Sequence, residues 1–157
     1  MVDSTLTPEA NGTRYGLYTS IGMMVYFVVA SLADLSDQIE LSFLNGGILA
    51  VGVCFAIARY KRDQQGRMAY LAGYGTGIVT ALVASVVFGL FFILYAVVIN
   101  PHIMDGLQAQ DLFGYELSVV IAFLAIVLQG AMLGMIITLI AMQYYKGPNH
   151  KPMTGLE

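Results

Sequence analysis

Three groups of residues have types and spacing that could support chemistry. Gly73-Tyr74-Gly75 repeats the centre of a potassium-channel selectivity filter, in which backbone carbonyls replace the hydration shell of the ion. Asn45 and Gln129 are large polar side chains deep within apolar segments, where they could line a small polar site. His102 follows an Asn-Pro pair and has carboxylates near it in the sequence, so it could transfer a proton. Each interpretation depends on the elements that position these residues.

The Gly-Tyr-Gly sequence fits a packed helix better than a filter. A filter needs a re-entrant loop and a Thr two residues before its Gly-Tyr-Gly, and Leu71 stands at that position here. The helical periodicity continues through the segment, and helix carbonyls are already hydrogen-bonded, so they cannot ligate ions. Small residues at every fourth position let two helix backbones approach closely. We therefore interpret the glycines on such stripes as helix-packing residues, namely Gly46, Gly73, Gly77, Gly130 and Gly134.

Four long apolar segments are the elements that would position these residues. The chain of 157 residues is 58% hydrophobic and 11% charged, with a mean hydropathy of +0.75. A soluble domain carries about 25% charged residues, so the composition indicates a membrane protein. A helix needs about 20 apolar residues to cross the hydrocarbon core. We predict an all-α membrane protein, a bundle of four transmembrane helices over about residues 15–35, 41–58, 69–99 and 117–142.

The charged residues divide between the two sides of this predicted bundle. Every Lys and Arg lies before the first segment, between the second and third, or after the fourth. The other two connections carry only acidic charges. By the positive-inside rule, both termini and the basic loop between the second and third segments lie in the cytoplasm. The expected organisation is a polar tail over 1–13, a membrane domain over 14–143 and a flexible tail over 144–157.

No constellation for catalysis, metal binding or cofactor binding stands out in the sequence. His102 and His150 fall on opposite sides of the predicted membrane, and Cys54 stands alone in an apolar run. There is no nucleophile elbow, no HExxH motif and no phosphate-binding glycine loop. A net charge of −3 provides no basic face for nucleic acid. We therefore expect no catalytic residue, no metal ligand, no cofactor and no nucleic-acid partner.

Asn45 and Gln129 leave two interpretations open. As buried polar residues they would form hydrogen bonds between helices and fix the helix register, each worth about 1 kcal/mol. Alternatively, the two side chains line a small polar site. No Asp, Glu, Lys or Arg lies in the middle of a predicted span, where ion-coupled transporters usually place them. The sequence therefore favours the first interpretation.

Short motifs at the ends of the spans carry a family resemblance. Arg14-Tyr15-Gly16-Leu17 opens the first span, and Arg59-Tyr60-Lys61-Arg62 closes the second. A glycine-rich start of the third span and Ile99-Asn100-Pro101 at its end complete the pattern. Over about residues 14–143 the chain resembles a bacterial family of small four-span inner-membrane proteins known only as a domain of unknown function. The resemblance implies four helices and a location in the bacterial cytoplasmic membrane, and it brings no activity or catalytic residues with it.

Our leading hypothesis is a non-enzymatic accessory or scaffolding subunit of a larger membrane complex. Its partners would be the lipid bilayer and other integral membrane subunits. Small-residue stripes on several helices exceed what one four-helix bundle needs for itself, which indicates docking to further helices. One alternative is a small oligomeric transporter or channel that works around Asn45 and Gln129. A third hypothesis is a membrane enzyme with His102 and the acidic connections as its candidate groups.

Overall fold

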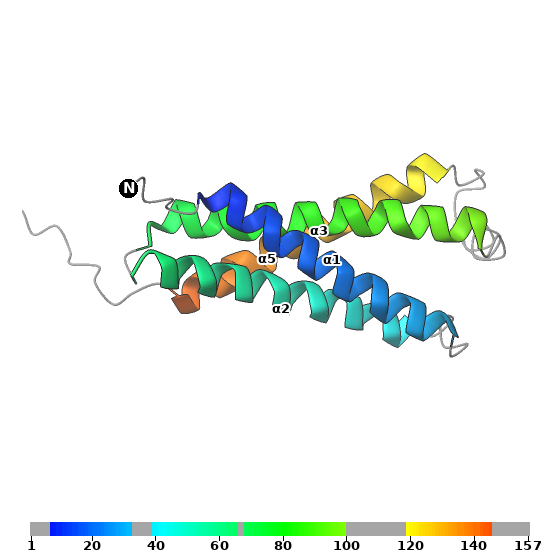
Figure 1. Ribbon diagram of the computed structural model, residues 1–157, viewed down its shortest axis with the longest axis horizontal. Coiled ribbons are helices and arrows are strands. Elements are labelled where there is room, and N and C mark those ends of the chain that lie inside the picture. Colours follow the sequence, from blue (N-terminus) through cyan, green and yellow to red (C-terminus); the bar gives the residue numbers. More distant parts are fainter. Residues whose placement is uncertain (1–6, 33–38, 66–67, 100–118, 146–157) are drawn as a thin grey trace, which may run out of the picture.

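Four α-helices make up the part of the chain that the structure describes. This computed structural model describes residues 7–32, 39–65, 68–99 and 119–145, and within them there is no strand. The helices in chain order are α1 (Pro8–Leu32), α2 (Ile39–Asp63), α3 (Tyr70–Val98) and α5 (Val119–Tyr145). Figure 1 shows that α1 and α3 begin, and α2 and α5 end, at the same end of the bundle. The predicted all-helical class is confirmed.

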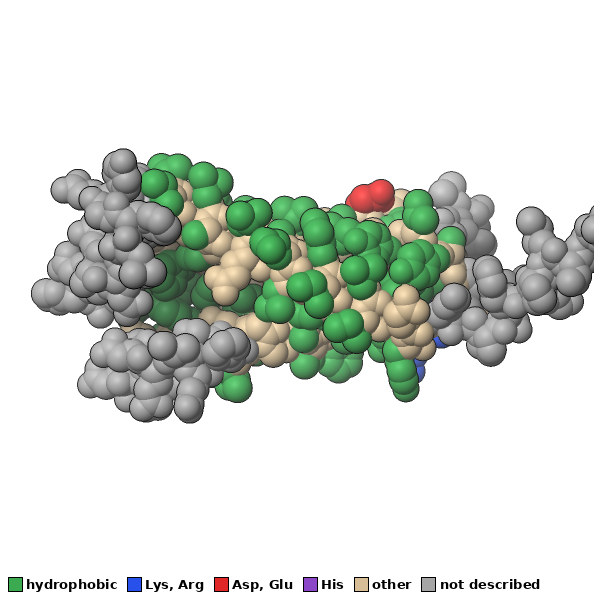
Figure 2. All heavy atoms as spheres, turned by 180° about the vertical axis from the view of Figure 1, so that it is seen from behind, with side chains coloured by type: hydrophobic (Ala, Val, Ile, Leu, Met, Phe, Trp, Pro, Cys, Tyr) green, Lys and Arg blue, Asp and Glu red, His purple; other side chains and the backbone are tan. Residues whose placement is uncertain are grey.

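Three helices match the predicted membrane spans in length and composition. Within the described residues, α1, α3 and α5 are long and apolar enough to cross a membrane. Figure 2 shows apolar side chains along one face of the molecule, with the charged side chains in view toward one end. α2 is not among the three candidates found within the described residues, and its last turns carry Arg59, Lys61, Arg62 and Asp63. A fourth span through α2 therefore stays a prediction.

The first helix begins earlier than its apolar segment. Thr7 caps it, because the Thr7 hydroxyl oxygen accepts a hydrogen bond of 3.2 Å from the Ala10 N–H. Pro8 occupies the first helical position, where a missing N–H costs nothing, and Glu9 places negative charge in the first turn. Residues 8–13, which the sequence analysis assigned to a polar tail, form the first turns of this helix. A local capping signal extends the helix beyond the hydrophobic stretch.

Several sequence predictions lie outside the described residues. They concern the helix stop at Asn100-Pro101-His102, the acidic connections around 33–38 and 100–118, and the tail from residue 146 onward.

α3 and α5 pack against each other along a seam of small residues. Successive turns of α3 face α5 in three pairs, namely Gly77 with Thr138, Ala81 with Gly134 and Ser85 with Gly130. The pairs advance by four residues on α3 and retreat by four on α5, as expected for antiparallel helices. Each pair contains one glycine, and a Cβ atom added there would overlap the partner side chain. The absent side chains thus allow the two backbones to approach closely.

α1 uses the same arrangement against its own neighbours. A Cβ atom added at Gly16 would lie 2.7 Å from the Val83 Cβ of α3 and 2.9 Å from the Thr80 carbonyl oxygen. Nearly one turn later on α1, Thr19 occupies the space above Gly52 of α2. α2 and α3 each contact all the other described helices, whereas α1 and α5 do not touch within the described residues. The α3 helix therefore carries close seams on two sides.

Apolar side chains of α2 fill the centre between these seams. Leu49, Val53 and Ile57 recur every four residues along α2 and are fully buried. They share one cluster with Ala84 of α3 and Met142 of α5. This spacing places them on one helix face, which is the face that α2 turns toward the other helices.

The seam predicts opposite effects for two glycines of α3. A Cβ atom at Gly77 would lie 2.5 Å from the Thr138 side chain, whereas one at Gly75 would meet nothing within 4 Å. Gly77→Ala should lower the free energy of unfolding by about 1–3 kcal/mol, because the seam is overpacked. Gly75→Ala should leave it unchanged or raise it by up to about 1 kcal/mol, because alanine favours the helix. Unfolding by sodium dodecyl sulfate in mixed micelles, followed by circular dichroism, measures both, and equal effects would contradict the seam.

Candidate functional site

The Gly73-Tyr74-Gly75 segment lies in the first turns of α3 and does not form a re-entrant loop. Residues 70–98 are one continuous α-helix, and the Gly73 N–H donates to the Ala69 carbonyl at 3.1 Å. Gly73 is buried beside Met68 and Met142, and a Cβ atom there would meet both side chains. The segment serves helix packing at Gly73, and its geometry is not that of an ion filter.

One end of the bundle gathers the basic side chains of α2, and we call it the basic end. It is the end at which α1 and α3 begin and α2 and α5 end (Figure 1). Arg59 pairs with Asp63 one turn later, with 3.5 Å between Nε and Oδ2. Lys61 donates to the backbone oxygen of Tyr145 at 3.0 Å and lies 5.7 Å from the centre of the Tyr145 ring. Lys61 thus binds the carbonyl end of α5, where the helix dipole attracts a cation.

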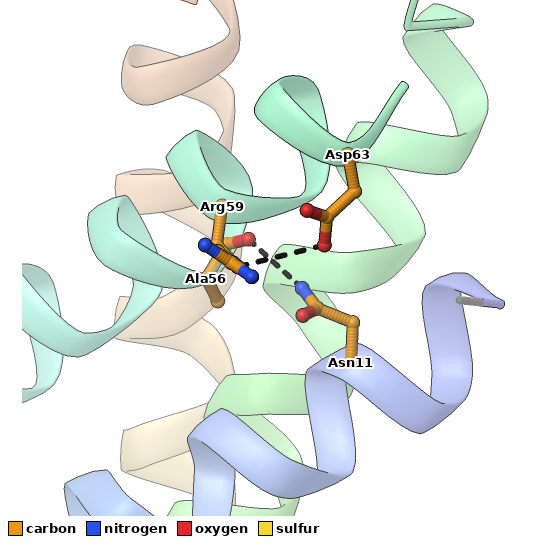
Figure 3. Close-up of polar contacts among 4 residues, drawn as sticks. All are labelled: Asn11, Ala56, Arg59 and Asp63. Atoms are coloured by element: carbon orange, nitrogen blue, oxygen red, sulfur yellow. Dashed lines mark hydrogen bonds and ion pairs between the residues drawn. The ribbon is translucent and has the colours of Figure 1, made fainter. Parts of the chain in front are cut away.

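A buried amide connects α1 to α2 beneath this end. The Asn11 Nδ2 donates to the backbone oxygen of Ala56 at 2.9 Å, and Asn11 is 2% exposed. Figure 3 shows the amide of Asn11 directed at Ala56, next to the Arg59–Asp63 pair. Sequence analysis missed this residue because it assigned 1–13 to a tail. The capping sequence at Thr7-Pro8-Glu9 was the signal that could have placed Asn11 in a helix.

Asn45 lies half-buried on α2. Its side-chain oxygen is buried and has no hydrogen-bond partner among the described residues. A buried amide oxygen without a donor costs free energy of about 1–3 kcal/mol. Asn45 therefore does not make the interhelical hydrogen bond through its oxygen that the sequence led us to expect.

Gln129 corrects the prediction of a buried polar pair. Its side chain is exposed on the outer face of α5, between Leu128, which is 64% exposed, and Met132, which is 58% exposed. The pattern of apolar residues along α5 could not reveal that Gln129 is exposed, because the helix is hydrophobic around its whole circumference. Gln129 thus does not share a buried site with Asn45, and the interpretation of the two as one polar lining is wrong for the single chain.

The packing glycines are used within the chain. Gly46 faces Leu133 of α5, and Gly73, Gly77, Gly130 and Gly134 face the neighbours described above. Open space surrounds only Gly47 and Gly75 among the glycines of the described helices. The expected surplus of small-residue faces is therefore absent from the described part of the bundle, and it no longer argues for docking.

The described residues form no group of three His, Cys, Asp or Glu side chains that could hold a metal ion.

The family model for a protein of unknown function (DUF4199) matches residues 14–146, which is most of the chain. The chain belongs to the DUF4199 family. No curated protein and no solved structure matches it. Membership of DUF4199 bears out the resemblance seen in the sequence, and it assigns no activity to the Asn11, Asn45 or Gln129 amides.

The Asn11 hydrogen bond predicts a stability effect in this DUF4199 chain. Asn11→Ala removes the 2.9 Å bond to Ala56 and a buried side chain, so the free energy of unfolding should fall by about 1 kcal/mol or more. Thr13→Ala is the matched control, because Thr13 is exposed in the same turn of α1, and it should change stability by less than about 0.5 kcal/mol. The detergent unfolding measurement distinguishes the two. Equal losses for both variants would show that the Asn11 amide has no specific role.

Proposed function

We propose that the chain is a non-catalytic accessory subunit of a larger membrane complex, and that it docks to another membrane protein through the outer face of α5. The observation that supports this is the exposed amide of Gln129 on an otherwise apolar helix surface. Lipid offers this amide no hydrogen-bond donor or acceptor, and an unsatisfied amide in hydrocarbon costs several kcal/mol. A helix from a partner subunit would satisfy it.

The depth of Gln129 in the helix excludes a simpler explanation. It lies ten residues after the start of α5 at Val119, which corresponds to about 15 Å along the axis. Its short side chain cannot bridge that distance to the headgroups, as a terminal Lys or Arg side chain can. The amide therefore needs a protein partner in the membrane or remains unsatisfied.

Other features of α5 also favour its outer face as the docking surface. Within an apolar stretch of 18 residues, only 11% of α5 is buried inside the bundle, compared with 33% of α3. Ala125, one turn before Gln129, is also exposed, and it leaves room for an approaching helix beside the amide. A partner helix that offers a polar side chain at this depth would gain about 1 kcal/mol from the hydrogen bond and more from packing.

We also propose the membrane arrangement that this docking requires. All four helices span the bacterial cytoplasmic membrane, with both termini and the basic end in the cytoplasm. The gathering of Arg59, Lys61 and Arg62 at one end supports this orientation through the positive-inside rule. In a Cys54→Ala background, Asp37→Cys should react with an impermeant maleimide in intact cells. Gln65→Cys should react only after the membrane is opened, and labelling of both in intact cells would contradict a fourth span.

The docking proposal predicts a site-specific crosslink. A photoreactive phenylalanine analogue at Met132, which is 58% exposed one turn after Gln129 and leaves the amide in place, should yield an adduct with a second membrane protein when native membranes are irradiated. The same analogue at Val29 is the matched control, because Val29 is 60% exposed on α1, away from α5. Denaturing electrophoresis and mass spectrometry of the tagged chain identify the adduct.

The result expected is an adduct at 132 with a different protein and none at 29. An adduct of the chain with itself alone would replace the accessory role with a homo-oligomer. Equal labelling at both positions, or labelling of lipid only, would contradict docking through α5.

A further inference from the structure

A cavity opens at the basic end of the bundle. Its volume is about 660 Å³, within the range of about 300–1,000 Å³ that small-molecule sites occupy. It lies along the end of α2, between residues of α1 and α5. Its lining combines aromatic, apolar and cationic side chains, namely Tyr15, Phe55, Ala58, Arg59, Lys61, Arg62, Gln65 and Tyr145.

Positive charge exceeds negative charge around this cavity. Three cationic side chains line it, and Asp63 is the carboxylate that pairs with one of them, Arg59. That pair is an exposed i,i+4 pair, which contributes little and can rearrange around a stronger anion. Lys61 uses one of its three N–H groups on the Tyr145 oxygen. The Arg62 guanidinium is exposed and has no partner among the described residues.

The cavity changes from apolar to cationic along one face of α2. Phe55, Arg59 and Arg62 stand at positions i, i+4 and i+7, which lie on the same side of a helix. The Phe55 ring is 64% exposed on the side of the hydrocarbon, and the cations lie one and two turns nearer the helix end. A phospholipid has the same order of groups, with its acyl chains below its phosphate.

We propose that this cavity binds the phosphate headgroup of an anionic phospholipid. The phosphate lies among Arg59, Lys61 and Arg62, where guanidinium and ammonium groups donate charge-assisted hydrogen bonds to its oxygens. The first acyl carbons lie along Phe55 and Ala58. This site is separate from the α5 face, and it requires only that α1, α3 and α5 cross the membrane.

A membrane lipid fits this cavity better than a soluble anion does. Charged side chains are costly in the hydrocarbon, so the basic end of the spanning helices lies at the boundary between lipid and water. Each cation near an anionic membrane surface favours an anionic lipid by about fivefold. The exposed Phe55 ring contributes only to a ligand that has an apolar part.

Fluorescence quenching tests this site directly. The chain contains no Trp, so Phe55→Trp places a single fluorophore in the cavity lining. The variant is reconstituted in phosphatidylcholine vesicles that contain the same small fraction of either brominated phosphatidylglycerol or brominated phosphatidylcholine. Brominated phosphatidylglycerol should quench several-fold more strongly, because the anionic headgroup draws that lipid to the cavity.

Charge variants of the reporter protein show whether the cavity causes the preference. Arg62→Gln should weaken the preference, and Lys61→Gln with Arg62→Gln should abolish it. Arg14→Gln is the matched control, because Arg14 is an exposed cation of α1 that does not line the cavity, and the preference should persist. Because Arg62 has no partner among the described residues, Arg62→Gln keeps the test valid if the double variant does not fold.

Three results would overturn the proposal. Equal quenching by the two brominated lipids would show that there is no anionic lipid site. An equal loss of preference in Arg14→Gln and Arg62→Gln would assign it to general surface charge. Relief of the quenching by millimolar inorganic phosphate would assign the cavity to a soluble anion.

Discussion

The close contact between α3 and α5 is the constraint on which the rest of the bundle depends. Helices in lipid gain no hydrophobic free energy from association, so van der Waals contact between backbones must hold them together. Gly77, Gly130 and Gly134 make that contact possible, because each receives a side chain from the opposite helix. α3 also contacts α1 and α2, so both pack against a helix that this seam holds in place.

The buried hydroxyl groups are compatible with these seams because each bonds within its own helix. Thr80 donates to the Thr76 carbonyl at 2.8 Å, and Ser85 donates to the Ala81 carbonyl at 2.7 Å. Thr138 does the same with Gly134 at 2.6 Å. A hydroxyl can reach the carbonyl one turn back, whereas the longer amides of Asn45 and Gln129 need partners elsewhere. The hydroxyls therefore need no partner outside their own helix, whereas the amides do.

The sequence was sufficient to predict the helices and the small-residue stripe, because both follow from local composition and a four-residue repeat. It did not reveal the start of α1, because the Thr7 cap lies outside the apolar stretch on which the segment was based. It also could not show which way Gln129 faces. α5 is apolar on all sides, so periodicity contains no information about the side that packs. The basic cavity likewise requires Tyr15, Phe55 and Tyr145 from three helices, which only the tertiary packing brings together.

Isolation of the tagged chain from its own membranes in native nanodiscs tests the central claim most directly, with mass spectrometry of the intact assembly. The docking account predicts a stoichiometric second membrane protein with the wild-type chain, and its loss or marked depletion with Gln129→Leu. Leu94→Gln, which adds an amide to an exposed site on α3, serves as the reverse control and should leave the assembly intact. Recovery of the wild-type chain alone, as a monomer with lipid, would contradict the account.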